Sequence, residues 1–187
     1  MSAAPTVRRE LRAGDLGRIV AHHGTVYAGE FGVDPTFEAQ VGASVAAAGK
    51  RGFPREREGI WIVELDGRHA GSVALTDEGD GLAALRWVVL DPGLRGHGLG
   101  RRLISEAVAT AESHGYETVG LETFSELRAA ARIYRDAGFE VLWEQAGPRW
   151  GCDDITYQRY ELSFQARAQS SSRPSTGSSE RPFSVSA

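Results

Sequence analysis

The residues best placed to do chemistry form a glycine-rich run between an apolar segment and an amphipathic one. The run is Arg95–Gly100, and Arg101 and Arg102 follow it directly. Glycines let an anion approach the backbone because no Cβ atom stands in the way, and the free N–H groups at the start of a helix attract phosphate. Arginines in the first helical turn oppose the helix dipole unless an anion offsets their charge. The run therefore predicts a phosphate-binding loop.

Two common nucleotide-binding loops do not fit this spacing. A dinucleotide fingerprint, G-x-G-x-x-G, would need a third glycine where Arg101 stands. A Walker loop, G-x-x-x-x-G-K-[ST], needs a lysine, and Lys50 is the only lysine of the chain. On its glycines alone, the run could also be a plain turn between a strand and a helix.

The elements on either side of the run follow from the spacing of apolar residues. Residues Leu82–Leu90 are apolar almost throughout, as in a strand that is covered on both faces. Residues Leu99–Ser113 carry apolar side chains at helical spacing, and Gly115 is suited to end that helix. The run therefore joins the end of a buried strand to the start of a helix.

The other segments predict further strands and helices. Asp15 and Asp34 are suited to cap two early helices, and Asp66-Gly67 favours a type I′ turn in a hairpin. The remaining expected elements are strand Thr6–Arg12, hairpin strands Ile60–Leu65 and Ala70–Thr76, strand Val119–Thr123, helix Glu126–Ala137 with Ser125 as its cap, and strands Phe139–Trp143 and Thr156–Phe164. The order β-α-α-β-β-β-α-β-α-β-β predicts an α/β fold with a mixed, mostly antiparallel twisted sheet flanked by helices.

Composition limits the class of protein. We expect one domain over residues 1–164 and a disordered tail over 165–187, which is rich in Ser, Pro and Arg. A net charge of -4 argues against nucleic-acid binding, and no apolar run is long enough to span a membrane. The single cysteine, Cys152, fits a reducing compartment, so we expect a cytoplasmic protein. No residues have metal-ligand spacing, so no metal is expected.

Two motifs together resemble those of the GNAT superfamily (GCN5-related N-acetyltransferases). The run Arg95–Gly100 is similar to the R-x-x-G-x-G loop that binds the pyrophosphate of coenzyme A, and Asp91-Pro92 is similar to the ending of the strand before it. About 30 residues further on, Ala130–Phe139 resembles the A-x-x-x-Y-x-x-x-G-F signature. The order of elements is also similar, and the resemblance covers nearly the whole of residues 1–164.

A closer likeness is to the acetyltransferase half of bacterial fusion proteins in which a MarR-type regulator precedes a GNAT domain. It rests on the segments 23–32, 85–86, 95–102 and 123–125. No winged-helix segment is expected in front of Thr6, so the resemblance does not imply DNA binding.

The resemblance implies an acetyltransferase that uses acetyl-CoA as co-substrate. The acetyl group would pass by direct attack in a ternary complex to the amine of a small molecule, peptide or protein, and a homodimer remains open. Tyr134 would be the general acid, and the acceptor would meet His23, Tyr27, Glu30 and Glu122. The cofactor-binding residues implied are Val88, Val89, Leu90, Arg95, Gly96, His97, Gly98, Leu99, Gly100 and Arg101.

Several of these roles have a purely structural alternative. Tyr134 and His23 could be packed core residues, and residues 88–90 could be ordinary strand core. The chain departs from the resemblance at Ala84, where many relatives have an acid, and at Leu127, where many have an asparagine. The general base is therefore unassigned: Glu122 is one candidate, ahead of Glu30 and Glu38, and a water chain is another. A non-catalytic acyl-CoA sensor is the alternative function.

Overall fold

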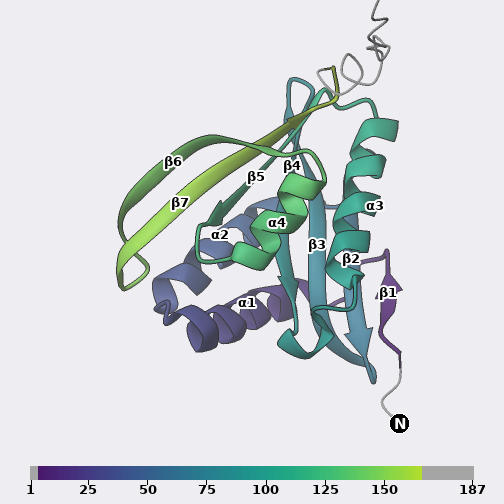
Figure 1. Cartoon of the computed structure of the whole chain (residues 1–187). Coiled ribbons are helices and arrows are strands. Elements are labelled where there is room, and N and C mark those ends of the chain that lie inside the picture. The colour runs from purple at the N-terminus through teal and green to yellow at the C-terminus, as the bar shows by residue number, and fades with distance from the viewer. Residues whose placement is uncertain (1–3, 166–187) are drawn as a thin grey trace, which may run out of the picture.

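A seven-stranded mixed sheet forms the middle layer of the computed structural model, which describes residues 4–165 (Figure 1). The strands lie side by side in the order β1-β2-β3-β4-β5-β7-β6. Their bounds are β1 Thr6–Arg8, β2 Gly59–Leu65, β3 Arg68–Gly79, β4 Leu82–Leu90, β5 Thr118–Phe124, β6 Glu140–Arg149 and β7 Cys152–Ser163. The helices are α1 Asp15–Phe31, α2 Pro35–Lys50, α3 Leu99–Ser113, α4 Arg128–Asp136 and the short 3-10 helix η1 Pro92–Leu94. The α/β fold expected from the sequence is therefore confirmed.

The helices cover the two faces of the sheet. On β2, Trp61 and Val63 pack into one core cluster with buried residues of α3 and α4, whereas Ile60 and Ile62 pack with α1 and α2. This alternation follows from the two-residue period of a strand. It leaves α1 and α2 on the face opposite α3 and α4 (Figure 1).

The two central parallel strands, β4 and β5, are paired over only part of their length. Their register runs from Leu82 opposite Thr118 to Leu85 opposite Leu121, and pairing stops there although both strands continue. On β4, Trp87 has a positive φ of 49°. Two residues of β4, Trp87 and Val88, lie opposite the single residue Val73 of β3. Such a β-bulge bends a strand. The sheet therefore opens between β4 and β5 at the end that leads to the glycine-rich loop.

Most bounds predicted around this opening are confirmed, and several details elsewhere are wrong. Residues Leu82–Leu90 and Leu99–Ser113 form their elements as predicted, and Asp34 caps α2 by accepting a hydrogen bond from the Thr36 N–H. Ser125 does not cap α4, because its hydroxyl donates to the Glu126 carboxylate and the helix begins only at Arg128.

The terminal strands also differ from their predicted lengths. The first strand ends at Arg8 rather than Arg12, and β6 and β7 are longer than predicted and meet at a turn of Trp150 and Gly151, both with positive φ. Most side chains of β6 are exposed, so its sequence lacks the alternation of apolar and polar residues that would have predicted its full length. Of the tail predicted for 165–187, residues 166–187 lie outside the described part of the chain.

Asp15 does not cap α1, as was predicted, but anchors the start of the helix to the sheet. Gly14 stands at the cap position, and the Asp15 side chain is 1% exposed. Its carboxylate accepts hydrogen bonds from the Arg12 N–H at 2.7 Å and from Arg8 at 2.8 Å. Arg8 in turn binds Glu64 of β2 at 2.9 Å. Burial opposes ionisation of Asp15, but these hydrogen bonds outweigh it, so the pKa of its carboxyl is lowered.

Replacing Asp15 by alanine should destabilise the fold, because Arg8 loses a buried partner. We expect the free energy of unfolding in urea to fall by about 3 kcal/mol, the usual loss when one member of a buried ion pair is removed. Because the folded pKa is lowered, the contribution is present above the ordinary carboxyl pKa and disappears as pH falls through the folded value. Asp153→Ala, at an exposed site, is the control. Equal urea midpoints for the two variants would contradict the anchoring role.

Candidate functional site

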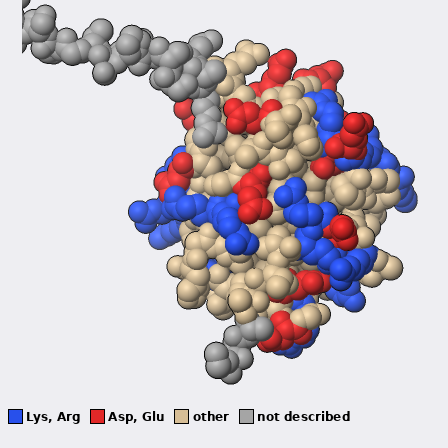
Figure 2. All heavy atoms as spheres, turned by 90° about the vertical axis from the view of Figure 1, so that its right-hand side faces the viewer, with Lys and Arg blue, Asp and Glu red and all other residues tan. Residues whose placement is uncertain are grey.

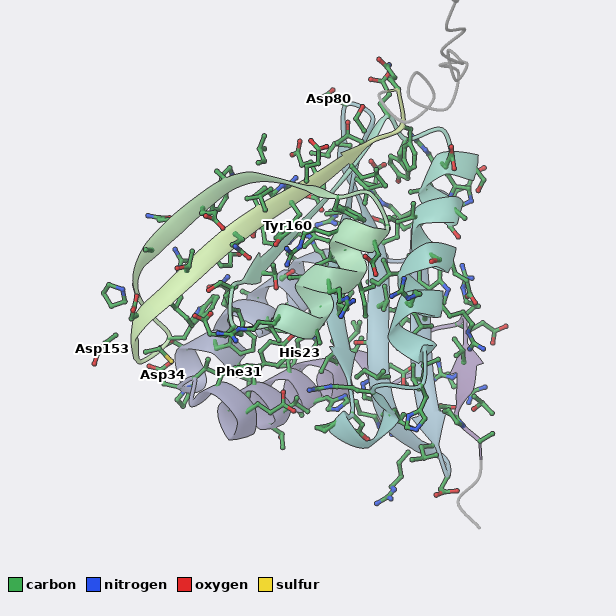
Figure 3. The ribbon with its side chains drawn as sticks, in the orientation of Figure 1. His23, Phe31, Asp34, Asp80, Asp153 and Tyr160 are labelled. Carbon is green, nitrogen blue, oxygen red and sulfur yellow. The ribbon has the colours of Figure 1, made fainter. Side chains whose placement is uncertain are left out.

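A cavity of about 140 Å³ lies where β4 and β5 have separated. The helices α1, α2 and α4, the end of β5 and the turn between β6 and β7 complete its walls (Figure 3). Its lining residues are His23, Tyr27, Phe37, Gln40, Val41, Ser44, Leu85, Arg86, Trp87, Val88, Leu121, Glu122, Thr123, Phe124, Leu127, Tyr134, Trp150 and Tyr157. Five of the predicted site residues therefore meet in one place: His23, Tyr27, Val88, Glu122 and Tyr134.

His23 is a buried, neutral side chain in the wall of the cavity. It is 4% exposed, and its Nδ1 lies 2.8 Å from the carbonyl oxygen of Ile19, one turn earlier in α1. Burial lowers the pKa of His23 to about 4. A carbonyl can only accept, so Nδ1 carries the proton and Nε2 is left as an acceptor. Both the predicted substrate contact and the core interpretation are compatible with this position.

Tyr27 follows His23 on the same face of α1 and joins the helix to β4. The two rings are stacked with centroids 5.7 Å apart. The Tyr27 hydroxyl donates a hydrogen bond to the Val88 carbonyl at 3.2 Å. Burial raises the pKa of Tyr27 to about 12, so the phenol stays protonated.

Tyr134 enters the cavity from the opposite face of the sheet. It is 4% exposed, and its ring centroid lies 6.1 Å from that of Phe139 and 6.0 Å from that of Tyr160. Burial raises the pKa of Tyr134 well above its ordinary value. The side chain is thus both a packed aromatic ring and a protonated phenol at the cavity wall.

Glu122 is the acidic side chain of the cavity wall. It lies on β5 just past Leu121, the last residue that pairs with β4. Its Oε2 accepts a hydrogen bond from the Tyr157 hydroxyl at 2.6 Å, and Arg159 of β7 lies 3.8 Å from Oε1. Burial and this hydrogen bond raise the pKa of Tyr157. The carboxylate of Glu122 is therefore held in place by the neighbouring strand.

The glycine-rich loop has the form that an anion site needs. Gly96 and Gly98 have φ values of 80° and 81°, which L side chains rarely adopt, and no atom lies within 4 Å of a Cβ added at either. Gly98 precedes the first turn of α3. Within the described residues, the N–H groups of 96–101 donate no hydrogen bond to the protein. These free donors at a helix N-terminus fit a diphosphate group.

The arginines of the loop already have acidic partners. Arg95 Nη1 lies 2.8 Å from each carboxylate oxygen of Glu30, at the end of α1. Arg101 contacts Asp136 of α4 at 2.8 Å. Glu30 therefore contacts the loop and does not line the cavity. Of the predicted strand residues, Val89 packs in one core cluster with residues of α1 and β7, and Leu90 packs against the core on the α3 side.

Part of the cavity wall had no signal in the sequence. Gln40 and Ser44 come from α2, and Trp150 and Tyr157 come from the hairpin of β6 and β7. These residues are far apart in the chain and belong to no local motif. Only the packing of the hairpin onto α2, where Trp150 donates to Gln40 at 3.0 Å, brings them together.

A metal site, a membrane span and a basic surface each require a distinct arrangement of side chains. Across residues 4–165, no three His, Cys, Asp or Glu side chains gather as a metal ion would need. No helix of that part is long and apolar enough to cross a membrane. On the face that carries α3 and β1, acidic side chains stand among the basic ones (Figure 2).

Comparisons with known proteins agree with this geometry. Residues 33–139, which include both sequence motifs, match the Acetyltransferase (GNAT) family. An N-acetyltransferase of Schizosaccharomyces pombe, described as uncharacterized, is 31% identical over 143 residues, which cover 73% of this chain and 83% of that protein.

Two solved structures have the same fold at low sequence identity. An N-acetyltransferase from Staphylococcus aureus Mu50 has a TM-score of 0.66 and 16% identity over 86% of this chain and 99% of that one. The protein yncA from Salmonella typhimurium, solved with acetyl-CoA, has a TM-score of 0.63 and 19% identity over 86% and 94% of the two chains. From its sequence match and its fold, this chain belongs to the GNAT family of acetyltransferases.

Proposed function

We propose that this protein transfers the acetyl group of acetyl-CoA to an amine by direct attack in a ternary complex. The observation that carries the proposal is the opening between β4 and β5, because β4 runs from the wall of the cavity at Val88 to the glycine-rich loop that follows Leu90. Acetyl-CoA would bind along this opening, and the amine of a small molecule, peptide or protein would enter the cavity.

The residues present fit acetyl-CoA as the acetyl donor. The free N–H groups of residues 96–101 would bind its diphosphate. Beyond Leu85, the edge of β4 that faces β5 has no strand partner among the described residues, although the carbonyls of Val88 and Leu90 accept hydrogen bonds from Tyr27 and Arg95. The pantetheine arm would pair with the backbone of this edge as an added strand does. The thioester of acetyl-CoA supplies the activated acetyl group, and the chain supplies binding, orientation and proton transfer.

Two side chains of the cavity are suited to move the protons of this reaction. Burial keeps the Tyr134 hydroxyl protonated in the free protein and makes it a weaker acid. The same low polarity would also disfavour the charged thiolate that departs, so the hydroxyl would donate its proton to that thiolate. The amine must lose a proton, and Glu122 is the carboxylate proposed to take it up, directly or through water. Where many relatives have an acid, this chain has Ala84, but Ala84 pairs with Gly120, and Glu122 lies two residues further along β5.

Other expectations stay proposals. They are a domain of residues 1–164, a homodimer, a cytoplasmic location, and the closer likeness to the acetyltransferase half of MarR fusion proteins. The alternative function is a non-catalytic acyl-CoA sensor, which the absent acid at Ala84 and the Leu127 in place of an asparagine would favour. Release of free coenzyme A with any amine of an acceptor library would exclude it.

The cofactor loop can be tested by comparing two of its glycines. Gly98→Val should raise the dissociation constant for acetyl-CoA by roughly 100-fold, because the strained φ displaces N–H groups that would each bind a charged group. Gly93→Val is the matched control, since Gly93 has no positive φ and open space around its Cβ. Calorimetry measures both constants. If the Gly98 variant bound acetyl-CoA like wild type, the loop would not be the diphosphate site.

The role of Tyr134 can be separated from its packing. Tyr134→Phe keeps the ring, so melting temperature and acetyl-CoA affinity should hold, while kcat should fall by roughly 10²–10⁴-fold, the usual contribution of a positioned acid. Because the pKa of Tyr134 is raised, the wild-type rate should not decline up to about pH 10 through this group.

Tyr160→Phe is the control for that experiment. Tyr160 is a buried tyrosine whose ring lies 6.0 Å from Tyr134, and it does not line the cavity. Its variant should keep the wild-type rate. Normal turnover by Tyr134→Phe, or equal losses in both variants, would leave Tyr134 as a packing residue only.

A further inference from the structure

Arg95, which directly precedes the free N–H groups of residues 96–101, is bound by the C-terminal end of α1. Arg95 uses Nη1 to contact both carboxylate oxygens of Glu30 at 2.8 Å, and its Nε donates to the Leu90 carbonyl at 3.0 Å. The Glu30 and Arg95 side chains are 27% and 38% exposed. The guanidinium is therefore folded back toward α1 and has its charge balanced within the protein.

A diphosphate at this loop would need the same guanidinium. Phosphate and carboxylate groups are recognised by arginine in the same way, through paired N–H donors in one plane. The Nη1 and Nε donors of Arg95 are already taken by protein groups. Binding of a diphosphate next to residues 96–101 thus sets two anions in competition for one cation.

A second contact of α1 lies on the same side. The Tyr27 hydroxyl, one turn before Glu30, donates to the carbonyl of Val88 on the part of β4 that has left β5. Tyr27 and Glu30 of α1 therefore contact Val88 and Arg95, two residues that are proposed to bind acetyl-CoA. Glu30 is the charged one, so its effect on an anionic ligand has a definite sign.

We propose that Glu30 is the counter-ion that acetyl-CoA displaces from Arg95, so that Glu30 limits the affinity of this protein for its acetyl donor. The inference rests on the proposed function, because it takes residues 96–101 as the diphosphate site. The opposite role, in which Glu30 orients Arg95 toward the diphosphate, predicts a change of opposite sign.

The test is the affinity of Glu30→Gln for acetyl-CoA, measured by calorimetry at low and high salt. Losing one carboxylate from a half-exposed pair should lower the dissociation constant roughly two- to five-fold at low salt, and less at high salt. Glu112→Gln makes the same change in net charge at an exposed site near the other end of α3, and its affinity should equal that of wild type.

Two further measurements show whether Arg95 carries the effect. In an Arg95→Ala background, Glu30→Gln should change nothing, because the cation for which the two anions compete is gone. S-acetylpantetheine, which lacks the diphosphate, should bind wild type and Glu30→Gln equally.

Each other result has a definite meaning. An unchanged affinity of Glu30→Gln for acetyl-CoA would overturn the proposal, and weaker binding would overturn it in favour of the orienting role. A gain in affinity that persists without Arg95, or with S-acetylpantetheine, would reduce it to a general charge effect and also overturn it. A wild-type protein that did not bind acetyl-CoA at all would overturn the proposed function, and this inference with it.

Discussion

The loss of backbone pairing between β4 and β5 after Leu85 is the constraint on which the site depends. Unpaired backbone groups are tolerated in a sheet only where something else can bind them. The bulge at Trp87 bends β4 away from β5. The Ser72 hydroxyl stabilises this bulge by donating a hydrogen bond to the Trp87 carbonyl at 2.6 Å. The cavity, the opening between the two strands and the position of Glu122 all follow from this one divergence.

The aromatic surroundings of the opening set the protonation states of the site. Tyr27, Tyr134 and Tyr157 have raised pKa values, and His23 has a lowered one, with burial as the first cause each time. Burial favours the neutral forms of these four side chains, so the phenols keep their protons and the imidazole stays uncharged. An amine acceptor bound in this cavity, as proposed, would be favoured in its neutral form, the form that can attack a thioester.

Charge in the rest of the site is balanced locally. Arg95, Arg101 and Arg159 each contact a carboxylate from another element, and these pairs join α1, α4 and β5 to their neighbours. An anionic acetyl donor therefore meets arginines that already have partners. If the loop binds the acetyl donor as proposed, binding would rearrange these ion pairs, and the acids around the loop would then influence affinity.

The sequence by itself determined the features that depend on nearby residues. A continuous apolar run placed β4, helical apolar spacing placed α3, and closely spaced glycines marked the loop, because each of these signals acts over a few residues. The tertiary structure decided which side chains share the cavity. Trp150 and Tyr157 reach it through the hairpin, Glu30 contacts Arg95 across 65 positions of the chain, and Asp15 is buried by Arg8 rather than capping a helix. Those contacts depend on how distant elements pack, and packing depends on the shapes and charges of all of them together.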